Sequence, residues 1–297
     1  MAFVEQLGRH FCVDHRPYFA LKIHARLASR FDRGDVMNSV EFKNVTKTFK
    51  IWHERPDSIK TILADALRLR FNKGEREART VLKNISFDIR NNDFVGIMGR
   101  NGAGKSTILK LISGIYHPTK GQVITNGRVA PLLELGAGFA TELSGYENIF
   151  LNASILGFGR AQATRYLDSI IEFSELGEAI SRPVRKYSSG MLVRLGFSIA
   201  VHLEADILLF DEILAVGDVG FQDKCMRKIR ELHQSGSSIV LVTHHPGQIE
   251  QFCDRCIVVD QSGILFDGGA KEGANCYRSL FPETSQAVPV YSASKKN

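Results

Sequence analysis

The segment Gly99-Arg-Asn-Gly-Ala-Gly-Lys-Ser-Thr107 decides the fold of this chain, because its first eight residues match the pattern G-x-x-x-x-G-K-[ST]. An apolar run with the length of a buried strand, Phe94–Met98, precedes the segment, and a run of helical character, Ser106–Ser113, follows it. Glycines allow backbone N–H groups to approach a ligand closely, and a helix N-terminus adds partial positive charge. The segment therefore predicts a strand, a phosphate-binding loop and a helix in succession.

The side chains at the end of this loop have expected partners on a bound nucleotide. Lys105 is expected to reach the β- and γ-phosphates, Ser106 to bind magnesium, and Thr107 to donate toward the α-phosphate. The other loop residues are expected to contact the nucleotide as well, and they are Gly99, Arg100, Asn101, Gly102, Ala103 and Gly104. The loop thus predicts a nucleoside triphosphate and Mg²⁺ as ligands.

Two acidic residues follow a second buried-strand run, Ile207–Phe210. Asp211 stands at the carboxyl end of that run, where a phosphate-loop enzyme holds its magnesium ion. Glu212 is the second carboxylate and the candidate general base for an attacking water. The pair therefore predicts hydrolysis of the bound nucleotide rather than binding alone.

The remaining strand candidates fall into two classes. Ile239–Val242 and Cys256–Val259 are apolar on both faces, as expected for parallel strands covered by helices. Three other segments are typical of antiparallel edge strands, and they are Val40–Phe42, Val81–Ile89 and Gln122–Val129. The alternation of strand and helix signals from residue 37 to about 281 predicts an α/β fold.

The chain divides into three zones, with boundaries after residues 36 and 281. Residues 1–36 form a basic extension in which Phe19, Ile23, Leu27 and Phe31 recur at helical spacing. This amphipathic segment has three readings: a helix on an anionic membrane face, a helix packed on the main domain, or a stretch before the true start at Met37. Residues 282–297 are small and polar and predict a flexible tail.

One insertion interrupts the main domain before the phosphate loop. Ser58–Phe71 carries apolar residues at helical spacing. One reading of this insertion is a helix that covers the edge of a sheet.

Composition excludes several classes of protein. The 297 residues are 44% hydrophobic and 24% charged, which is typical of a globular chain and not of a disordered one. No run of about 18 uncharged apolar residues is present, so no membrane span is expected. The net charge of +6 permits binding to nucleotides, nucleic acid or an anionic membrane. The five scattered cysteines indicate a reducing compartment, and Cys253 and Cys256 lack the second pair that a zinc site needs.

Four further motifs carry a family resemblance. Tyr187-Ser-Ser-Gly-Met191 opens an apolar helical run and resembles the signature motif of ABC-transporter ATPases. By the same resemblance, Asp218 matches the D-loop acid, His244 the switch histidine that contacts the γ-phosphate, and Phe49 the aromatic residue that stacks on adenine. The implied fold is a phosphate-loop NTPase of ABC type with an antiparallel β-subdomain and a helical subdomain, and the implied substrate is ATP.

The resemblance is closer still to the ATPase subunits of bacterial polysaccharide exporters, which move O-antigen, capsule or teichoic-acid chains. It is carried by the Arg-Asn-Gly-Ala-Gly form of the phosphate loop, by Leu132-Leu-Glu-Leu-Gly-Ala-Gly-Phe139 and by Asp211-Glu-Ile-Leu-Ala-Val-Gly-Asp218. The Q-loop glutamine is absent, and its place falls near Glu134, which is expected as a magnesium or water contact. The competing expectation is a soluble ABC-type ATPase that acts on nucleic acid or ribosomes.

The resemblance also implies partners and a location. The signature residues Ser188, Ser189 and Gly190 of one subunit are expected to face the ATP held by another, which implies a homodimer. Two copies of a polytopic permease are expected to pass a lipid-linked polysaccharide, with the coupling contact in the Glu134–Asn148 loop and the helices that follow it. The second reading of the Ser58–Phe71 insertion is a place near the entrance for this polymer. The ATPase would then be peripheral on the cytoplasmic face of the bacterial inner membrane, without a nucleic-acid partner.

Overall fold

A computed structural model of the chain describes residues 38–52, 76–132, 138–203, 205–211 and 219–281. Several sequence predictions lie outside these residues: the helix at 16–33, the insertion at 58–71, the tail at 282–297, and the site residues Glu134, Glu212 and Asp218.

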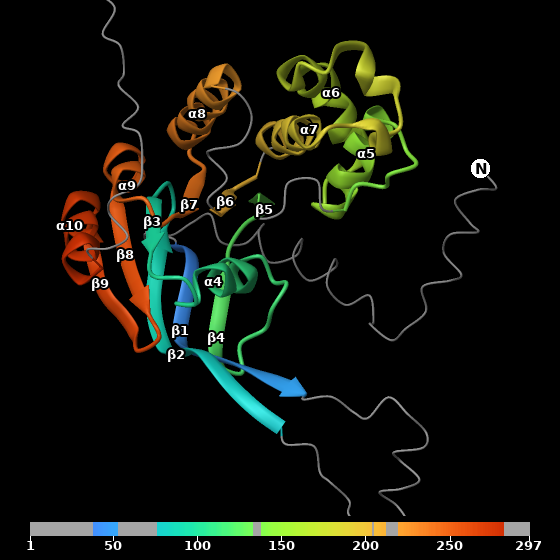
Figure 1. Cartoon of the computed structure of the whole chain (residues 1–297). Coiled ribbons are helices and arrows are strands. Elements are labelled where there is room, and N and C mark those ends of the chain that lie inside the picture. Colours follow the sequence, from blue (N-terminus) through green and yellow to red (C-terminus); the bar gives the residue numbers. More distant parts are fainter. Residues whose placement is uncertain (1–37, 53–75, 133–137, 204, 212–218, 282–297) are drawn as a thin grey trace, which may run out of the picture. The chain divides into compact units, whose positions relative to one another are not determined.

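A six-stranded sheet forms the centre of the described chain (Figure 1). Its strands, in spatial order, are β5 (Val129–Leu132), β6 (Ile207–Asp211), β7 (Ser238–Val242), β3 (Phe94–Met98), β8 (Arg255–Asp260) and β9 (Gly263–Gly269). All neighbouring pairs are parallel except β8 with β9. The prediction that the four apolar runs form parallel buried strands is therefore confirmed.

Helices cover both faces of this sheet. Alternate residues of β3 divide between two cores, with Phe94 and Met98 in one and Val95 and Ile97 in the other. The first core is shared with α8 (Val219–Gln234), α9 (Pro246–Phe252) and α10 (Ala270–Leu280). The second is shared with α4 (Lys105–Ile112), which lies between the large sheet and a smaller one.

The smaller sheet is antiparallel and has the order β2-β1-β4, with β1 at Asn38–Trp52, β2 at Arg76–Arg90 and β4 at Lys120–Thr125. Its antiparallel character was predicted, but Val40–Phe42 belongs to the middle strand and not to an edge. The single strand expected over Gln122–Val129 is also wrong, because β4 ends at Thr125 and β5 begins in the other sheet. Gly127, with a φ of 121°, turns the chain there.

A separate group of helices follows β5. It consists of α5 (Gly145–Ile155), α6 (Arg160–Ser174), two short 3-10 turns at Gly177–Ser181 and Val184–Lys186, and α7 (Ser189–His202). These helices enclose a core around Ile149, Ile170 and Leu195, and Figure 1 shows α5, α6 and α7 grouped together. This group is the helical subdomain that the resemblance implied.

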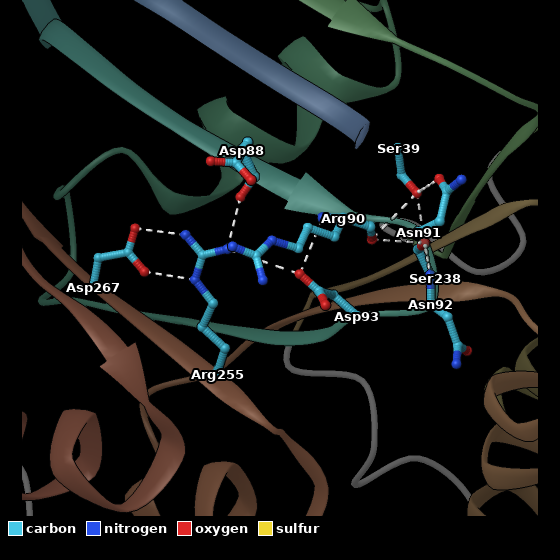
Figure 2. A network of polar contacts seen from close by, with 9 residues as sticks. All are labelled: Ser39, Asp88, Arg90, Asn91, Asn92, Asp93, Ser238, Arg255 and Asp267. Carbon is cyan, nitrogen blue, oxygen red and sulfur yellow. Dashed lines mark hydrogen bonds and ion pairs between the residues drawn. The ribbon is translucent and has the colours of Figure 1, made fainter. Parts of the chain in front are cut away.

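A polar network fixes the end of β2 to the large sheet (Figure 2). Arg255 donates two hydrogen bonds to Asp267, at 2.6 and 2.7 Å, and a third to the Asp88 carbonyl oxygen at 3.0 Å. Nearby, the buried hydroxyls of Ser39 and Ser238 lie 2.6 Å apart. Since these residues come from both sheets, the network joins the end of β2 to β8 of the large sheet.

Candidate functional site

The phosphate loop connects β3 to α4, as the sequence predicted, and its glycines are required by the backbone. Gly102 and Gly104 have φ values of 83° and 97°, a region that side chains disfavour. A Cβ on Gly104 would also lie 2.5 Å from Leu82 Cδ2, and one on Gly99 would lie 2.3 Å from the Val259 carbonyl oxygen. The loop therefore lies directly against β2 and β8.

Lys105 is the first residue of α4, and only 7% of it is exposed. Its Nζ donates to the carbonyl oxygens of Gly99 at 2.8 Å and Arg100 at 3.2 Å. These bonds hold the ammonium group inside the curve of the loop. A buried cation needs such partners, and phosphate oxygens are chemically equivalent acceptors for it.

The N-terminus of α4 has Gly104 as its cap residue, and no side chain caps it. The backbone N–H groups of the first helical turn have no intrahelical acceptor by geometry, so they point toward the end of the helix. Together with the helix dipole, they make this end suited to an anion.

A cavity of about 520 Å³ opens at this helix end. Its described lining residues are Arg79, Val81, Asn101, Gly102, Gly104, Lys105, Ser106, Thr107 and Asp211. The structure thus brings the phosphate loop and the acid at the end of β6 to one cavity, although more than a hundred residues separate them in sequence. A phosphate-rich ligand fits such a lining.

Two oxygen-bearing side chains in this cavity suit magnesium. Mg²⁺ prefers hard oxygen ligands and is usually held by one or two carboxylates together with substrate phosphates and water. Ser106 supplies a hydroxyl and Asp211 a half-buried carboxylate. No cluster of three His, Cys, Asp or Glu side chains with metal-site geometry occurs among the described residues. The donor set therefore fits a metal ion that is completed by its substrate.

His244 lies elsewhere, in a second cavity of about 770 Å³. Its described lining residues are Arg100, Asn101, Ala103, His244, Asp260, Gln261, Tyr277 and Phe281. Asn101 belongs to both cavities, so the phosphate loop lines both of them. The ring of His244 contacts that of His245, with centroids 3.7 Å apart. Both histidines are half-buried.

The signature residues begin α7 in the helical subdomain. Ser188 is the cap residue of α7, and its hydroxyl accepts a hydrogen bond from the Met191 backbone N–H at 3.2 Å. Tyr187 anchors the turn before the helix by donating to the Ala179 carbonyl oxygen at 2.7 Å, and burial raises the pKa of its hydroxyl. Among the described residues, neither cavity is lined by Ser188, Ser189 or Gly190.

Phe49 is not among the described residues that line either cavity. Its ring meets the edge of Tyr116, with centroids 5.3 Å apart. Lys47 Nζ lies over both rings, 5.0 Å from the centroid of Phe49 and 5.1 Å from that of Tyr116. The adenine-stacking role of Phe49 therefore stays a prediction.

Sequence reasoning missed two cavity residues on β2, Arg79 and Val81. The available signal was the expected antiparallel pairing of the two N-terminal strands. Phe49 pairs directly with Arg79 across the sheet. A residue opposite an expected nucleotide contact is itself a candidate, because cross-strand partners share a face.

Comparisons with known proteins agree with this geometry. The family model described as "ABC transporter" matches residues 82–215. The chain is 44% identical over 240 residues to the O-antigen export system ATP-binding protein RfbB of Klebsiella pneumoniae, which covers 80% of this chain and 97% of that protein. It is 40% identical over 238 residues to the teichoic acids export ATP-binding protein TagH of Listeria innocua, covering 80% of this chain and 69% of that one.

Solved structures share the fold. One is titled as the ATP-binding subunit of an ABC transporter, with a TM-score of 0.63 and 22% identity over 84% of this chain and 95% of that chain. Another is the dimeric structure of a post-hydrolysis state of the ATP-binding cassette MJ0796 bound to ADP and Pi, with a TM-score of 0.61 and 23% identity. It covers 78% of this chain and 98% of that one.

Proposed function

Because this chain belongs to the ABC transporter family, among the ATP-binding proteins of polysaccharide export systems, we propose that it hydrolyses ATP to drive a surface polysaccharide across the bacterial cytoplasmic membrane. One structural observation supports this most directly. The phosphate loop and Asp211, far apart in sequence, line the same cavity. Relatives named for O-antigen and teichoic-acid export favour this function over action on nucleic acid or ribosomes.

Hydrolysis needs the γ-phosphoryl group to be positioned and its charge to be neutralised. Lys105 and the N-terminus of α4 supply positive charge in the cavity, and both are already in place. Ser106 and Asp211 would hold Mg²⁺, which neutralises charge on the phosphates when bound. Glu212, the residue after β6, would take a proton from the attacking water, and His244 would contact the γ-phosphate.

The signature residues lie outside the phosphate-loop cavity of their own chain, and this separation supports a dimer. Ser188, Ser189 and Gly190 line neither cavity of their own chain, and Ser188 and Ser189 are exposed. A second copy placed head to tail would bring these residues to the γ-phosphate held by the first. Asp218 would belong to the same contact.

A membrane partner is also required by this function. None of the helices in the described ranges is long and apolar enough to cross a bilayer. We infer that two copies of a polytopic permease carry the lipid-linked polysaccharide and that the ATPase binds them at the cytoplasmic face. The helical subdomain offers a contact, since Leu143, Tyr146 and Ile155 are exposed apolar side chains at or beside α5.

Replacing the proposed base tests the chemistry. Glu212→Gln should lower the turnover of ATP by about 10²- to 10⁴-fold while ATP still binds, because only the proton acceptor is lost. The variant should also accumulate as an ATP-bound dimer, measured by size-exclusion chromatography with light scattering. Glu178→Gln removes an exposed carboxylate of the helical subdomain and serves as the matched control. Unchanged turnover in Glu212→Gln would remove Glu212 as the base.

Affinity purification tests the transport assignment. A tagged chain purified from detergent-solubilised native membranes should bring down a polytopic permease in equal amount. Recovery with ribosomes or nucleic acid instead would contradict the exporter function and leave the ATPase chemistry intact.

A further inference from the structure

The phosphate-loop cavity has a cation in its wall that the proposed mechanism does not use. Among the described lining residues the cations are Lys105 and Arg79. Lys105 is buried within the loop, whereas Arg79 is exposed on β2. No acidic residue in the described part of the chain forms an ion pair with Arg79. As far as the described residues go, the guanidinium of Arg79 is thus exposed beside an anion-binding loop and accessible to a bound anion.

The geometry of β2 brings Arg79 within reach of the loop. At Gly104 a Cβ would lie 3.3 Å from Val81 Cγ1 and 2.5 Å from Leu82 Cδ2, so the strand and the loop are in contact there. Alternate residues of a strand share a face and lie roughly 7 Å apart, which places Arg79 on the face of Val81. Both residues line the cavity. An extended arginine side chain can span that separation.

The strand is also held firmly in this position. Arg255 donates to the carbonyl oxygen of Asp88, near the end of β2, and pairs with Asp267 of the large sheet (Figure 2). At the level of Arg79 itself, the hydroxyls of Thr48 and Thr80 lie 2.9 Å apart across the strands. These contacts fix the backbone from which the guanidinium extends.

We infer that Arg79 is a nucleotide-binding residue whose guanidinium contacts the polyphosphate tail of ATP, an inference that rests on the proposed function. The planar guanidinium matches phosphate oxygens in geometry and stays charged at any physiological pH. Mg²⁺ and Lys105 leave the triphosphate anionic, so a second cation from β2 is favourable. Because the contact is made in the ground state, it serves affinity more than turnover.

The test compares ATP binding and hydrolysis by the full-length chain and three variants at low and high salt. Arg79→Gln should raise the Kd and KM for ATP about tenfold, the effect expected for a hydrogen bond between charged groups. It should change kcat less than KM, and its affinity should depend less steeply on salt than that of the wild type. Arg79→Lys should recover most of the affinity. Lys83→Gln removes the same charge from an exposed position of β2 outside the cavity and should bind ATP like the wild type.

Two outcomes would overturn the assignment. Equal ATP affinity in Arg79→Gln and Lys83→Gln would show that Arg79 does not contact the nucleotide. If Arg79→Gln and Arg79→Lys lose the same amount of ATP affinity, and salt does not change that loss, then Arg79 acts through its shape or through stacking and not through its charge. A wild-type chain that binds no ATP would instead overturn the proposed function itself, and the wild-type measurement separates that case from the other two.

Discussion

The proposed ATP site of a dimer combines two helix N-termini, that of α4 with the phosphate loop and that of α7 with the signature residues. The two N-termini differ in structure. At α4 the cap residue is Gly104, in a left-handed conformation and without a capping side chain. At α7 the cap residue is Ser188, whose hydroxyl already accepts from Met191 N–H. The first end lies at the wall of an open cavity that is lined by residues of its own chain, whereas the second is exposed.

The packing behind the two ends differs as well. Helix α4 is held between two sheets, with Ile108 and Leu109 fully buried. Helix α7 contributes Leu195 to the core of the helical subdomain and Phe197 to the core of the large sheet, so it lies at the border of two cores. The subdomain meets α8 through an aromatic cluster and the ion pair of Glu175 with Lys224. The α4 end is thus complete within one chain, whereas the α7 end is suited to meeting a ligand that another chain holds.

The largest expected effect comes from the α4 end. Lys105→Ala should lower kcat/KM for ATP by at least about 100-fold, because a preorganised positive group at the phosphates is lost. It should also destabilise the chain by about 1–3 kcal/mol, since the Gly99 and Arg100 carbonyl oxygens lose their buried partner. Hydrolysis kinetics and thermal unfolding measure the two effects.

Lys110→Ala is the matched control for Lys105→Ala. It removes a lysine from the last turn of the same helix, outside the described lining of both cavities. We expect hydrolysis close to that of the wild type. Near-normal ATP hydrolysis in Lys105→Ala would contradict the conclusion that the N-terminus of α4 forms a complete phosphate-binding site within one chain.

Ser188 allows the structural and functional roles of the α7 end to be separated. Ser188→Ala removes the cap and should destabilise the chain by about 1 kcal/mol, or a Tm decrease of about 2–4 °C. Ser188→Asp keeps a capping oxygen and adds a negative charge that favours the helix N-terminus, so it should restore the Tm. The same charge would repel a γ-phosphate, so hydrolysis should fall further in Ser188→Asp than in Ser188→Ala.

Thermal unfolding and ATP hydrolysis on the same preparations decide the Ser188 comparison. Wild-type hydrolysis in Ser188→Asp would mean that no phosphate approaches this helix end. The two N-termini would then differ in function and not only in construction.

The phosphate loop at the N-terminus of α4 was predicted far better from the sequence than the other residues that line its cavity. Buried parallel strands are continuous apolar runs, and the phosphate loop is a contiguous motif, so both could be recognised locally. The break within Gln122–Val129 could not, because it depends on Asp206, whose carboxylate accepts from Arg128 N–H at 2.6 Å. Arg79 was missed for the same reason, since its place in the cavity follows from the pairing of β2 with β1 across an insertion.

The smallest expected effect concerns the junction between the helical subdomain and the sheets. Glu175, which follows α6, accepts hydrogen bonds from Lys224 of α8 at 2.8 Å and from Arg194 of α7 at 2.7 Å. These two cations lower the pKa of its carboxyl group. Glu175→Gln keeps the shape but loses the charge. Its side chain is 47% exposed, so the loss should be about 0.5–1 kcal/mol, or a Tm decrease of about 1–4 °C at pH 7.

The pH dependence of this difference identifies its cause. The pKa of Glu175 is lower in the folded than in the unfolded chain, so the carboxylate stabilises the fold at pH values above its ordinary pKa. That contribution is lost as the pH falls through the folded-state pKa. The Tm difference between wild type and Glu175→Gln should therefore be largest near neutral pH and vanish in acid. Glu142→Gln, which breaks the more exposed ion pair with Arg185, should leave the Tm unchanged at both pH values. A Tm difference for Glu175→Gln that persists in acid would mean that shape, and not charge, joins α7 to α8, and the junction would then resemble the packed surroundings of α4.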